Sequence, residues 1–358
     1  MNVLSLFDGM SCGQIALTNL GCFPDKYYAS EVDKFAIQQA HHVFPDTIHI
    51  GDVTQVDVSK LDKIDLIIGG SPCQSFSFAG KQAGMATTEN IEITDLDQYL
   101  DLKIMGFEFT GQSYLFWEYM RILTEVRKYN PDVKFLLENV VMSKKWEAVL
   151  TNAIGVEPVM INSNLVSAQN RKRLYWTNIA EITQPEDEGI FIRDILEDDV
   201  DEKYFISGRG ITDRMRKNLK SVDDKSFCLT ATNYKGAQAN GTTLIQRDKA
   251  CCLKYERTEY GKKIRKDYES GKIKEQRKNI RRLVPRKDRK SNCLTTVQKD
   301  NLLQTGTGLR RLTPVECARL QTVPSWYEWV VSDTQVYRMC GNGWTVRVIE
   351  HILKNLFV

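Results

Sequence analysis

Residues 2–13, NVLSLFDGMSCG, contain the stretch that decides the fold. A short apolar run breaks at Asp8-Gly9, and apolar residues then recur at helical spacing until Gly21. The same order of apolar run, turn and helical pattern returns several times, up to the run KFLLENV at 134–140. Strands that alternate with helices in this way predict a mostly parallel, doubly wound α/β sheet with helices on both faces.

The alternation stops at about Glu181, and as far as about Thr307 the chain has short β-like pieces among Gly, Asn and charged residues. Helical spacing resumes in LTPVECARLQ, where Thr313 can cap a helix and Pro314 stands at its first position. We expect the final amphipathic stretch, WTVRVIEHILKNLF, to return to the first domain. The predicted domains are 1–180, 181–307 and a return segment at 308–358.

Composition limits the class of protein. The 358 residues are 42% apolar and carry a net charge of +3, but the segment from Arg247 to Lys290 holds 18 basic and 7 acidic residues. This basic segment indicates either a polyanion partner or a solvated helix face. The nine Cys include no C-x-x-C pair, only four His are present, and no apolar run reaches 18 residues. We therefore expect a reduced cytoplasmic protein with no metal and no membrane segment.

Small and acidic residues follow the first strands. Gly9 and Gly13 occupy the first strand-to-helix turn, Glu31 ends the second predicted strand and Asp52 the third. Each feature alone is more often structural. Ligands of doubly wound sheets bind at the carboxyl ends of the strands, so the three together predict a nucleoside site. A phosphate clamp is not expected, because the G-x-G-x-x-G pattern is absent.

Reactive residues follow the next strands. Cys73 stands after Pro72 at the end of the fourth strand, and Glu138 ends the fifth. Arg171 and Arg173 follow within the sequence QNRKR, which begins at Gln169. A buried structural Cys and a pair of salt-bridging Arg are the alternatives, but a thiol, a carboxyl group and two guanidinium groups are expected to meet at one sheet edge. Such a set is typical of covalent catalysis supported by a general acid.

With these residues in order, the chain resembles the DNA cytosine 5-methyltransferase family along essentially its whole length. The matching segments are LFDGMSCG, SEVDKFA, GDVTQV, GGSPCQSFS, LFWEYMRIL, LLENV, SAQNRKRLYW, RRLTPVECARLQTVP and GNGWTV. The resemblance implies a Rossmann-like methyltransferase fold that binds S-adenosyl-L-methionine. It also implies a catalytic centre of Cys73, Glu138, Arg171 and Arg173, in which the thiolate adds to carbon 6 of cytosine and the carboxyl group protonates nitrogen 3.

The resemblance further implies that Phe7, Gly9, Glu31, Asp52, Pro72 and Asn342 line the cofactor pocket. We expect their neighbours to take part as well, namely Asp8, Gly13, Val32, Val53 and Trp344. The first turn reads DGMSCG where many bacterial members have AGxGG, and Ser71 and Trp344 resemble the animal de novo branch. An acidic stretch of 26 residues between Gly84 and Gly111, with six acids and one Lys, is longer than the usual catalytic loop.

The implied partner is double-stranded DNA, read by a target recognition domain at about 181–307, with the target base flipped out of the duplex. The near-repeats KSFCLT at 225–230 and KSNCLT at 290–295 either contact DNA or form plain strands with a buried Cys. The predicted DNA-binding residues are Gln74, Ser75, Thr230, Asn233, Thr295, Thr296, Arg281 and Arg282. A cognate restriction endonuclease is a candidate partner in a bacterial cell, and an orphan phage enzyme is the alternative.

Three rival functions compete with this prediction. A tRNA cytosine methyltransferase on the same scaffold is disfavoured, because its Cys-Phe-Thr hallmark is absent. A catalytically inactive nucleic-acid-binding adaptor is disfavoured by the intact catalytic residues. A nucleotide-dependent oxidoreductase is disfavoured by the missing glycine pattern.

Overall fold

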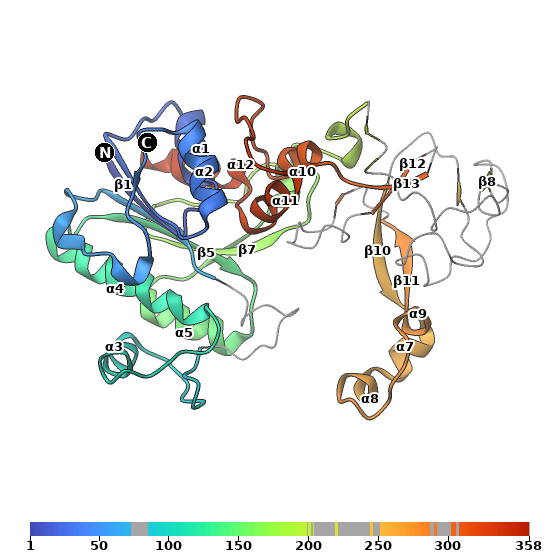
Figure 1. Ribbon diagram of the computed structural model, residues 1–358, viewed down its shortest axis with the longest axis horizontal. Helices are drawn as coiled ribbons and strands as arrows, with labels where there is room; N and C mark the ends of the chain where they lie inside the picture. The colour runs from blue at the N-terminus through green and yellow to red at the C-terminus, as the bar shows by residue number, and fades with distance from the viewer. Residues whose placement is uncertain are drawn as a thin grey trace.

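The computed structural model describes residues 1–72, 85–198, 200–201, 203, 219–220, 244–245, 251–286, 290–291, 302–305 and 308–357. It shows an α/β body that carries both chain termini, and a smaller region built on strands β10 to β13 at the opposite end (Figure 1). A helical group projects from this smaller region beside the body.

The body is built on a seven-stranded sheet in the order β3-β2-β1-β4-β5-β7-β6. Its strands are β1 (Asn2–Leu6), β2 (Lys26–Ser30), β3 (Ile48–His49), β4 (Leu66–Gly70), β5 (Lys134–Val140), β6 (Val159–Asn162) and β7 (Lys172–Thr177). Strands β1 to β5 run parallel to one another, whereas β7 runs antiparallel to both β5 and β6. The predicted mostly parallel sheet is confirmed, and the start of β7 lies at the same edge as the carboxyl ends of the parallel strands.

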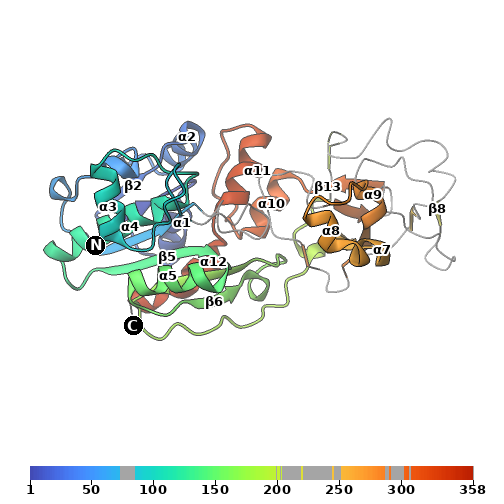
Figure 2. The ribbon, with the colours of Figure 1, turned by 90° about the horizontal axis from the view of Figure 1, so that it is seen from below.

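Helices cover both faces of this sheet, as predicted (Figure 2). One buried apolar cluster joins the sheet to helices α1 (Cys12–Asn19), α2 (Lys34–Val43), α10 (Pro314–Leu320), α11 (Asp333–Asn342) and α12 (Val346–Leu353). A second cluster, on the other face, contains residues of α3 (Leu96–Ile104), α4 (Phe116–Tyr129) and α5 (Lys144–Ile154). Alternate strand residues supply the two clusters, because successive side chains of a strand point to opposite faces. The short 3-10 helices are η1 (Val53–Gln55), η2 (Val58–Lys60), η3 (Ser113–Leu115), η4 (Ser163–Leu165), η5 (Ile192–Asp194) and η9 (Lys354–Leu356).

The C-terminal segment begins with a capped helix and ends with a helix that packs on the body. Thr313 caps α10 and Pro314 is its first residue, while the Glu316 side chain accepts from the Thr313 backbone N–H. Helix α12 then packs beside α1 in the body, with Val348 and Ile352 fully buried.

The second region contains an antiparallel sheet in the order β11-β10-β12-β13. Its strands are β10 (Cys251–Arg257), β11 (Arg281–Pro285), β12 (Leu302–Thr305) and β13 (Gly308–Arg311), and a separate pair is formed by β8 (Leu219–Lys220) and β9 (Leu244–Ile245). Three short helices lie between β10 and β11, namely α7 (Glu259–Lys263), α8 (Arg265–Glu269) and α9 (Arg277–Ile280).

Residues near both ends of the expected region 181–307 take part in its surroundings. Ile182, Ile190, Ile195 and Leu196 pack against the apolar cluster of the body, whereas β13 extends the second sheet to Arg311. Of the two near-repeats, 225–230 lies outside the described residues, and only Lys290 and Ser291 of the other are described. No helix in the described part of the chain has the length and apolarity needed to cross a membrane.

Candidate active site

The first turn of the sheet has an unusual backbone. Phe7, Gly9 and Ser11 all have left-handed φ values, at 59°, 59° and 60°. Such values are uncommon for residues with a side chain, so this turn is strained at Phe7 and Ser11. The buried Asp8 carboxylate accepts hydrogen bonds from the Ser11 hydroxyl and from Tyr27 Oη, the latter at 2.8 Å. Burial raises the pKa of Asp8 to about 6.

Gly13 has a packing role in this turn. A Cβ at this position would lie 2.1 Å from Ile68 Cδ1 and 3.2 Å from Tyr27 Oη. The absence of a side chain therefore lets α1 approach β4 closely. A direct cofactor contact by Gly13 stays a prediction.

Glu31 follows β2 and faces the first turn. Its Oε2 accepts from Gly9 N at 2.8 Å, while Oε1 accepts from Val32 N at 2.7 Å and Asp33 N at 2.8 Å. A carboxylate offers about four acceptor positions, so roughly one remains for a ligand hydroxyl. The neighbouring Val32 side chain is 69% exposed and can contact a flat apolar group.

Asp52 follows β3 and caps η1. Its Oδ1 accepts from Thr54 N at 2.8 Å and from the Thr54 hydroxyl at 2.9 Å, which leaves Oδ2 toward solvent. The next residue, Val53, is buried, and its carbonyl accepts from Arg121 at 3.2 Å. The predicted cofactor residues Glu31 and Asp52 thus lie at successive strand ends, and each keeps acceptor capacity.

Glu138 of β5 lies between two hydrogen-bond donors. Arg173 Nε is 2.8 Å from its Oε1, and Trp344 Nε1 is 3.1 Å from its Oε2. In the strand register Glu138 stands opposite Gly70 on one side and Tyr175 on the other. The structure therefore brings Glu138 and Arg173 together as predicted. It also places Trp344, which we expected in the cofactor pocket, against the same carboxyl group.

Arg171 is buried beside this pair and binds backbone. Its guanidinium donates to Gly341 O at 3.3 Å and to Gly343 O at 2.9 Å. Gln321, which sequence analysis did not single out, donates to Gly343 O at 3.0 Å and also to Cys340 O. Both side chains fix the segment around the exposed Asn342, another predicted cofactor residue, and set the position of the Trp344 that follows.

The turn that leads to Cys73 is held from β5. Asn139 Nδ2 donates to Ser71 Oγ at 3.0 Å and to Ser71 O at 3.3 Å. Pro72, predicted to line the cofactor pocket, follows at once and is partly buried. Cys73, Gln74 and Ser75 lie outside the described residues.

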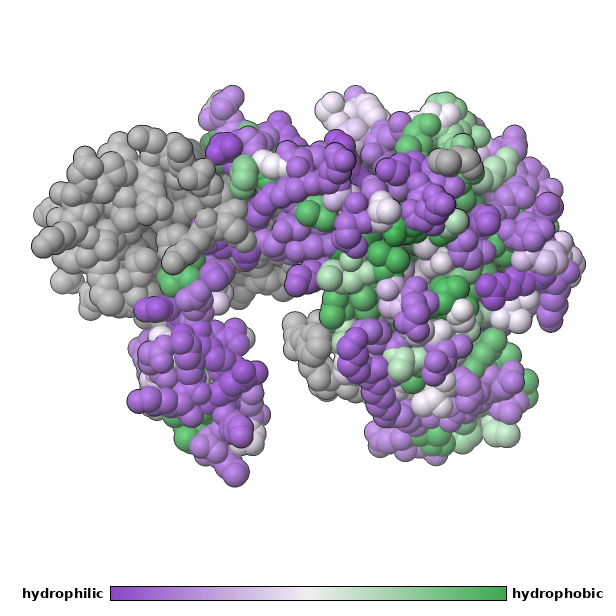
Figure 3. All heavy atoms as spheres, turned by 180° about the vertical axis from the view of Figure 1, so that it is seen from behind, coloured by the Kyte–Doolittle hydropathy of each residue, from purple (hydrophilic) through white to green (hydrophobic). Residues whose placement is uncertain are grey.

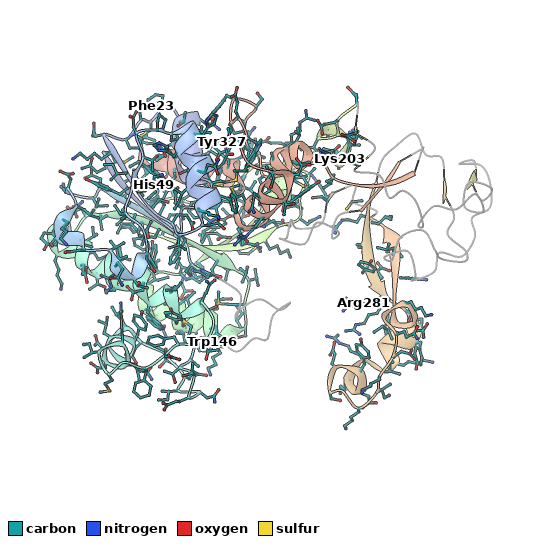
Figure 4. The ribbon with its side chains drawn as sticks, in the orientation of Figure 1. Phe23, His49, Trp146, Lys203, Arg281 and Tyr327 are labelled. Carbon is teal, nitrogen blue, oxygen red and sulfur yellow. The ribbon has the colours of Figure 1, made fainter. Side chains whose placement is uncertain are left out.

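The C-terminal segment closes on the first turn through a residue that sequence analysis did not identify. Tyr327, which Figure 4 labels beside the sheet, is buried and donates its hydroxyl to Met10 O at 2.9 Å. A Tyr two residues before Trp329 gives no sequence signal of this contact. No group of three or more His, Cys, Asp or Glu suited to a metal ion occurs within the described ranges.

The predicted DNA-binding residues are only partly described. Thr230, Asn233, Thr295 and Thr296 lie outside the described residues. Arg281 and Arg282 begin β11 at the base of the projecting helices, where Figure 4 labels Arg281.

Lys290, at the end of the basic segment, has a structural role instead. It is buried, its Nζ donates to Asn164 O at 3.0 Å and to Ile190 O, and it lies 4.7 Å from the Phe191 ring centroid.

Known proteins share this architecture. The family model described as C-5 cytosine-specific DNA methylase matches residues 1–101 and 103–358. The type II methyltransferase M.NlaX of Neisseria lactamica is 28% identical over 368 aligned residues, covering 99% of this chain and 95% of that protein. The orphan methyltransferase M.Rho11sI of Bacillus phage rho11s is 31% identical over 236 residues, which cover 58% of this chain and 46% of that protein. The S. pombe Dnmt2 methyltransferase structure covers 100% of both chains at TM-score 0.54 and 17% identity, and thus shares the fold. The chain belongs to the family of C-5 cytosine-specific DNA methylases, enzymes that take their methyl group from S-adenosylmethionine.

Proposed function

We propose that this enzyme methylates carbon 5 of a flipped-out cytosine at a specific sequence in duplex DNA, through a covalent bond between Cys73 and carbon 6. The observation that carries the proposal is the Glu138 carboxyl group, held by Arg173 at 2.8 Å beside the Ser71-Pro72 turn that leads to Cys73. A nucleophile and an acid at one sheet edge suit attack on a ring that must accept negative charge.

The residues at the first three strand ends fit S-adenosylmethionine. Glu31 keeps about one acceptor position for a ribose hydroxyl, and the outer oxygen of Asp52 can accept from an amino group. The exposed Val32 suits the face of an adenine ring. When bound, the cofactor supplies a methyl group on a positively charged sulfur. Calorimetric titration should show about 10- to 100-fold weaker cofactor binding in Glu31→Ala and Asp52→Ala, since each loses a charge-assisted hydrogen bond.

The protein's own groups then act on the base. The Cys73 thiolate forms a bond to carbon 6, an electron pair of the ring moves toward nitrogen 3, and a proton held between the Glu138 carboxyl group and nitrogen 3 passes to nitrogen 3. Arg173 stabilises the carboxylate that remains. Carbon 5 thereby becomes nucleophilic. After it has gained the methyl group, loss of its proton and departure of the thiolate restore the aromatic ring.

The covalent step is tested with duplex DNA that carries 5-fluorocytosine. Fluorine cannot leave as a proton does, so the wild type should remain attached to the DNA after denaturation. Cys73→Ser should neither methylate DNA nor form this adduct, while it still binds cofactor. Cys22→Ser, at a partly buried thiol outside the described site, is the matched control and should behave as the wild type. Adduct formation by the Cys73 variant would show that another residue is the nucleophile.

We also propose that the region 181–307 chooses the methylated sequence in the cytoplasm of a bacterial or phage-infected cell. Its sequence lacks the strand-helix alternation and carries the basic segment. Short polar side chains such as Thr230 and Thr295 can meet base edges in the major groove. Transplanting the region into a relative of known specificity and sequencing the modified DNA tests this assignment. An active hybrid that keeps the recipient's target would contradict it. Resistance of the methylated host DNA to a neighbouring endonuclease would identify a restriction partner.

A further inference from the structure

Trp344 lies between the end of the C-terminal segment and the reacting edge of the sheet. Its side chain is almost buried, and its indole N–H points at Glu138 Oε2, 3.1 Å away. Arg173 binds the other oxygen of the same carboxyl group at 2.8 Å. One donor on each oxygen fixes the rotation of the carboxyl group about its last bond. We infer that Trp344 is a positioning residue for the catalytic carboxyl group of Glu138, an inference that rests on the proposed function.

Gly70 makes this contact possible. It stands opposite Glu138 in the β4–β5 register, and a Cβ there would lie 2.8 Å from Trp344 Nε1 and 3.1 Å from Glu138 Oε2. Any side chain at position 70 would occupy the space that the indole needs. The glycine before Ser71 therefore has a specific reason to be there, apart from backbone freedom.

The indole is held in place from its own backbone. Arg171 and Gln321 both donate to Gly343 O, directly before Trp344. On the other side, the Cys12 thiol donates to Trp344 O at 3.7 Å, and burial raises the pKa of this thiol to about 12, so it remains a donor. Three side chains from distant parts of the chain thus fix the backbone from which the indole extends.

This arrangement suits the proton transfer. While a proton lies between Glu138 and nitrogen 3 of the bound base, Oε2 can still accept from the indole through a lone pair. When the Cys73 bond to carbon 6 forms, the proton leaves Glu138 for the base. The negative charge that appears on the carboxylate is then met by Arg173 and by Trp344. A hydrogen bond to a charged acceptor is stronger than one to a neutral acceptor, so the Trp344 contact tightens as the reaction proceeds.

Trp344→Phe removes the N–H and keeps an aromatic ring. We expect kcat to fall by about 10- to 100-fold, the effect of losing a hydrogen bond to a charged group. The KM for S-adenosylmethionine should stay near that of the wild type. The opposite result, a raised KM with kcat intact, would show that Trp344 only lines the cofactor pocket, and it would overturn the inference. Trp329→Phe, at a Trp that packs on Tyr327, is the matched control and should change neither constant.

A double-mutant cycle separates this role from a general structural one. If Trp344 acts through Glu138, Trp344→Phe should cost nothing further in a Glu138→Gln background, whereas additive losses would refute the inference. Gly70→Ala places a methyl group against the indole N–H and should give the same loss of kcat. This second variant tests the inference if the Trp344 variant fails to fold. A Glu138→Gln enzyme with full activity would instead refute the proposed function itself.

Discussion

Two outgrowths of the molecule hold their charged residues in opposite ways. The acidic insertion, residues 85–110, packs against α4 and carries α3, whereas the basic appendage, residues 258–280, carries α7 to α9 (Figure 1). The insertion is anchored by a fully buried carboxylate, Glu118 of α4, which accepts from Tyr99, Lys103 and Arg121. Phe109 of the insertion stacks on the Tyr114 ring that follows it, with ring centroids 4.7 Å apart.

The appendage, in contrast, has its charged residues at the surface. It forms a hydrophilic lobe that stands apart from the body (Figure 3). Its ion pairs, such as Lys262–Glu259, lie at the surface, and its packing depends on Gly261, where a Cβ would lie 2.2 Å from Ile280 O. Exposed ion pairs contribute little to stability, whereas exposed cations remain available to phosphates.

The contrast shows what each set of charges does. Arg121 extends the buried anchor of the insertion to Val53 O and Val56 O at the two ends of η1, next to Asp52. Charges in the insertion therefore belong to the structure of the cofactor side of the body. The charges of the appendage lie at the surface, where we propose that its cations act on DNA, so changes in the two outgrowths should have different consequences.

The largest effect is expected for Glu118→Ala. The change leaves Arg121 and Lys103 without their shared anion in a buried setting. Breaking such a pair costs about 3–5 kcal/mol, and we expect about 3 because the Lys103 side chain is 36% exposed and can be rehydrated. Urea unfolding measures the loss. Glu89→Ala, at an exposed acid of the same insertion, is the control and should change stability by less than about 0.5 kcal/mol. An equal loss of stability in both variants would show that the buried Glu118 stabilises the insertion no more than an exposed acid does.

Asp8→Asn tests a buried charge of the body through pH. The folded-state pKa of about 6 lies above the ordinary value of 3.8, so the folded protein binds this proton more tightly than the unfolded chain. The stabilisation is complete below pH 3.8 and is lost as the pH rises through about 6. The wild type should lose about 2–3 kcal/mol over this window, and Asp8→Asn should lose much less. Asp25→Asn is the control, because Asp25 pairs with the terminal amino group, its pKa is lowered, and its effect has the opposite sign. A pH profile that Asp8→Asn leaves unchanged would show that Asp8 is not the group that titrates.

Removal of the appendage should affect DNA binding alone. Arg257 and Arg281 are the last paired residues of β10 and β11, so a two-residue Asn-Gly turn can replace 258–280. The plot of log affinity against log salt should flatten by up to about 0.9 per lost phosphate contact. Thermal unfolding of the body and the methylated sequence should not change. The double variant Arg281→Gln/Arg282→Gln, with the helices intact, should give a smaller flattening. An unchanged salt dependence of the DNA affinity would show that the appendage does not contact phosphates.

The smallest effect belongs to the surface of the insertion. Lys145 of α5 pairs with Glu92, with side chains 57% and 44% exposed. Lys145→Ala should lower the free energy of unfolding by less than about 1 kcal/mol, and moderate salt should reduce even this difference. Lys144→Ala, at the neighbouring exposed lysine, serves as the control. A loss close to that of Glu118→Ala would mean that surface pairs hold the insertion as well.

Local pattern was sufficient for much of the fold. The strand-helix alternation, the cap at Thr313 and the return of α12 all follow from residues that are close in sequence. The reversal of β7 could not be predicted, because it depends on how η4 turns the chain between β6 and β7. The packing of Ile190 and Ile195 on the body was also hidden, because these residues lie in a stretch without periodicity.

Sequence placed Glu138 with Arg173, because the ends of neighbouring strands meet at one edge. It did not indicate the contact of Trp344 with Glu138, which are 206 positions apart in sequence, or the buried role of Lys290. Such contacts depend on the packing of distant segments. The small residue that admits one of them, Gly70, stands in the segment GGSPCQSFS without a local signal of this role.

The pairing of α1 with α12 has a consequence for synthesis. Ile15 and Leu17 of α1 are covered by a cluster to which Val348 and Ile352 of α12 belong, yet α12 is translated more than three hundred residues later. At about 5–20 residues per second, this interval lasts tens of seconds on the ribosome. During that time the side of the first helix that α12 covers lacks this cover, and Trp344 has not reached Glu138. The nascent enzyme therefore cannot assemble its reacting centre until translation has passed the segment that closes the body.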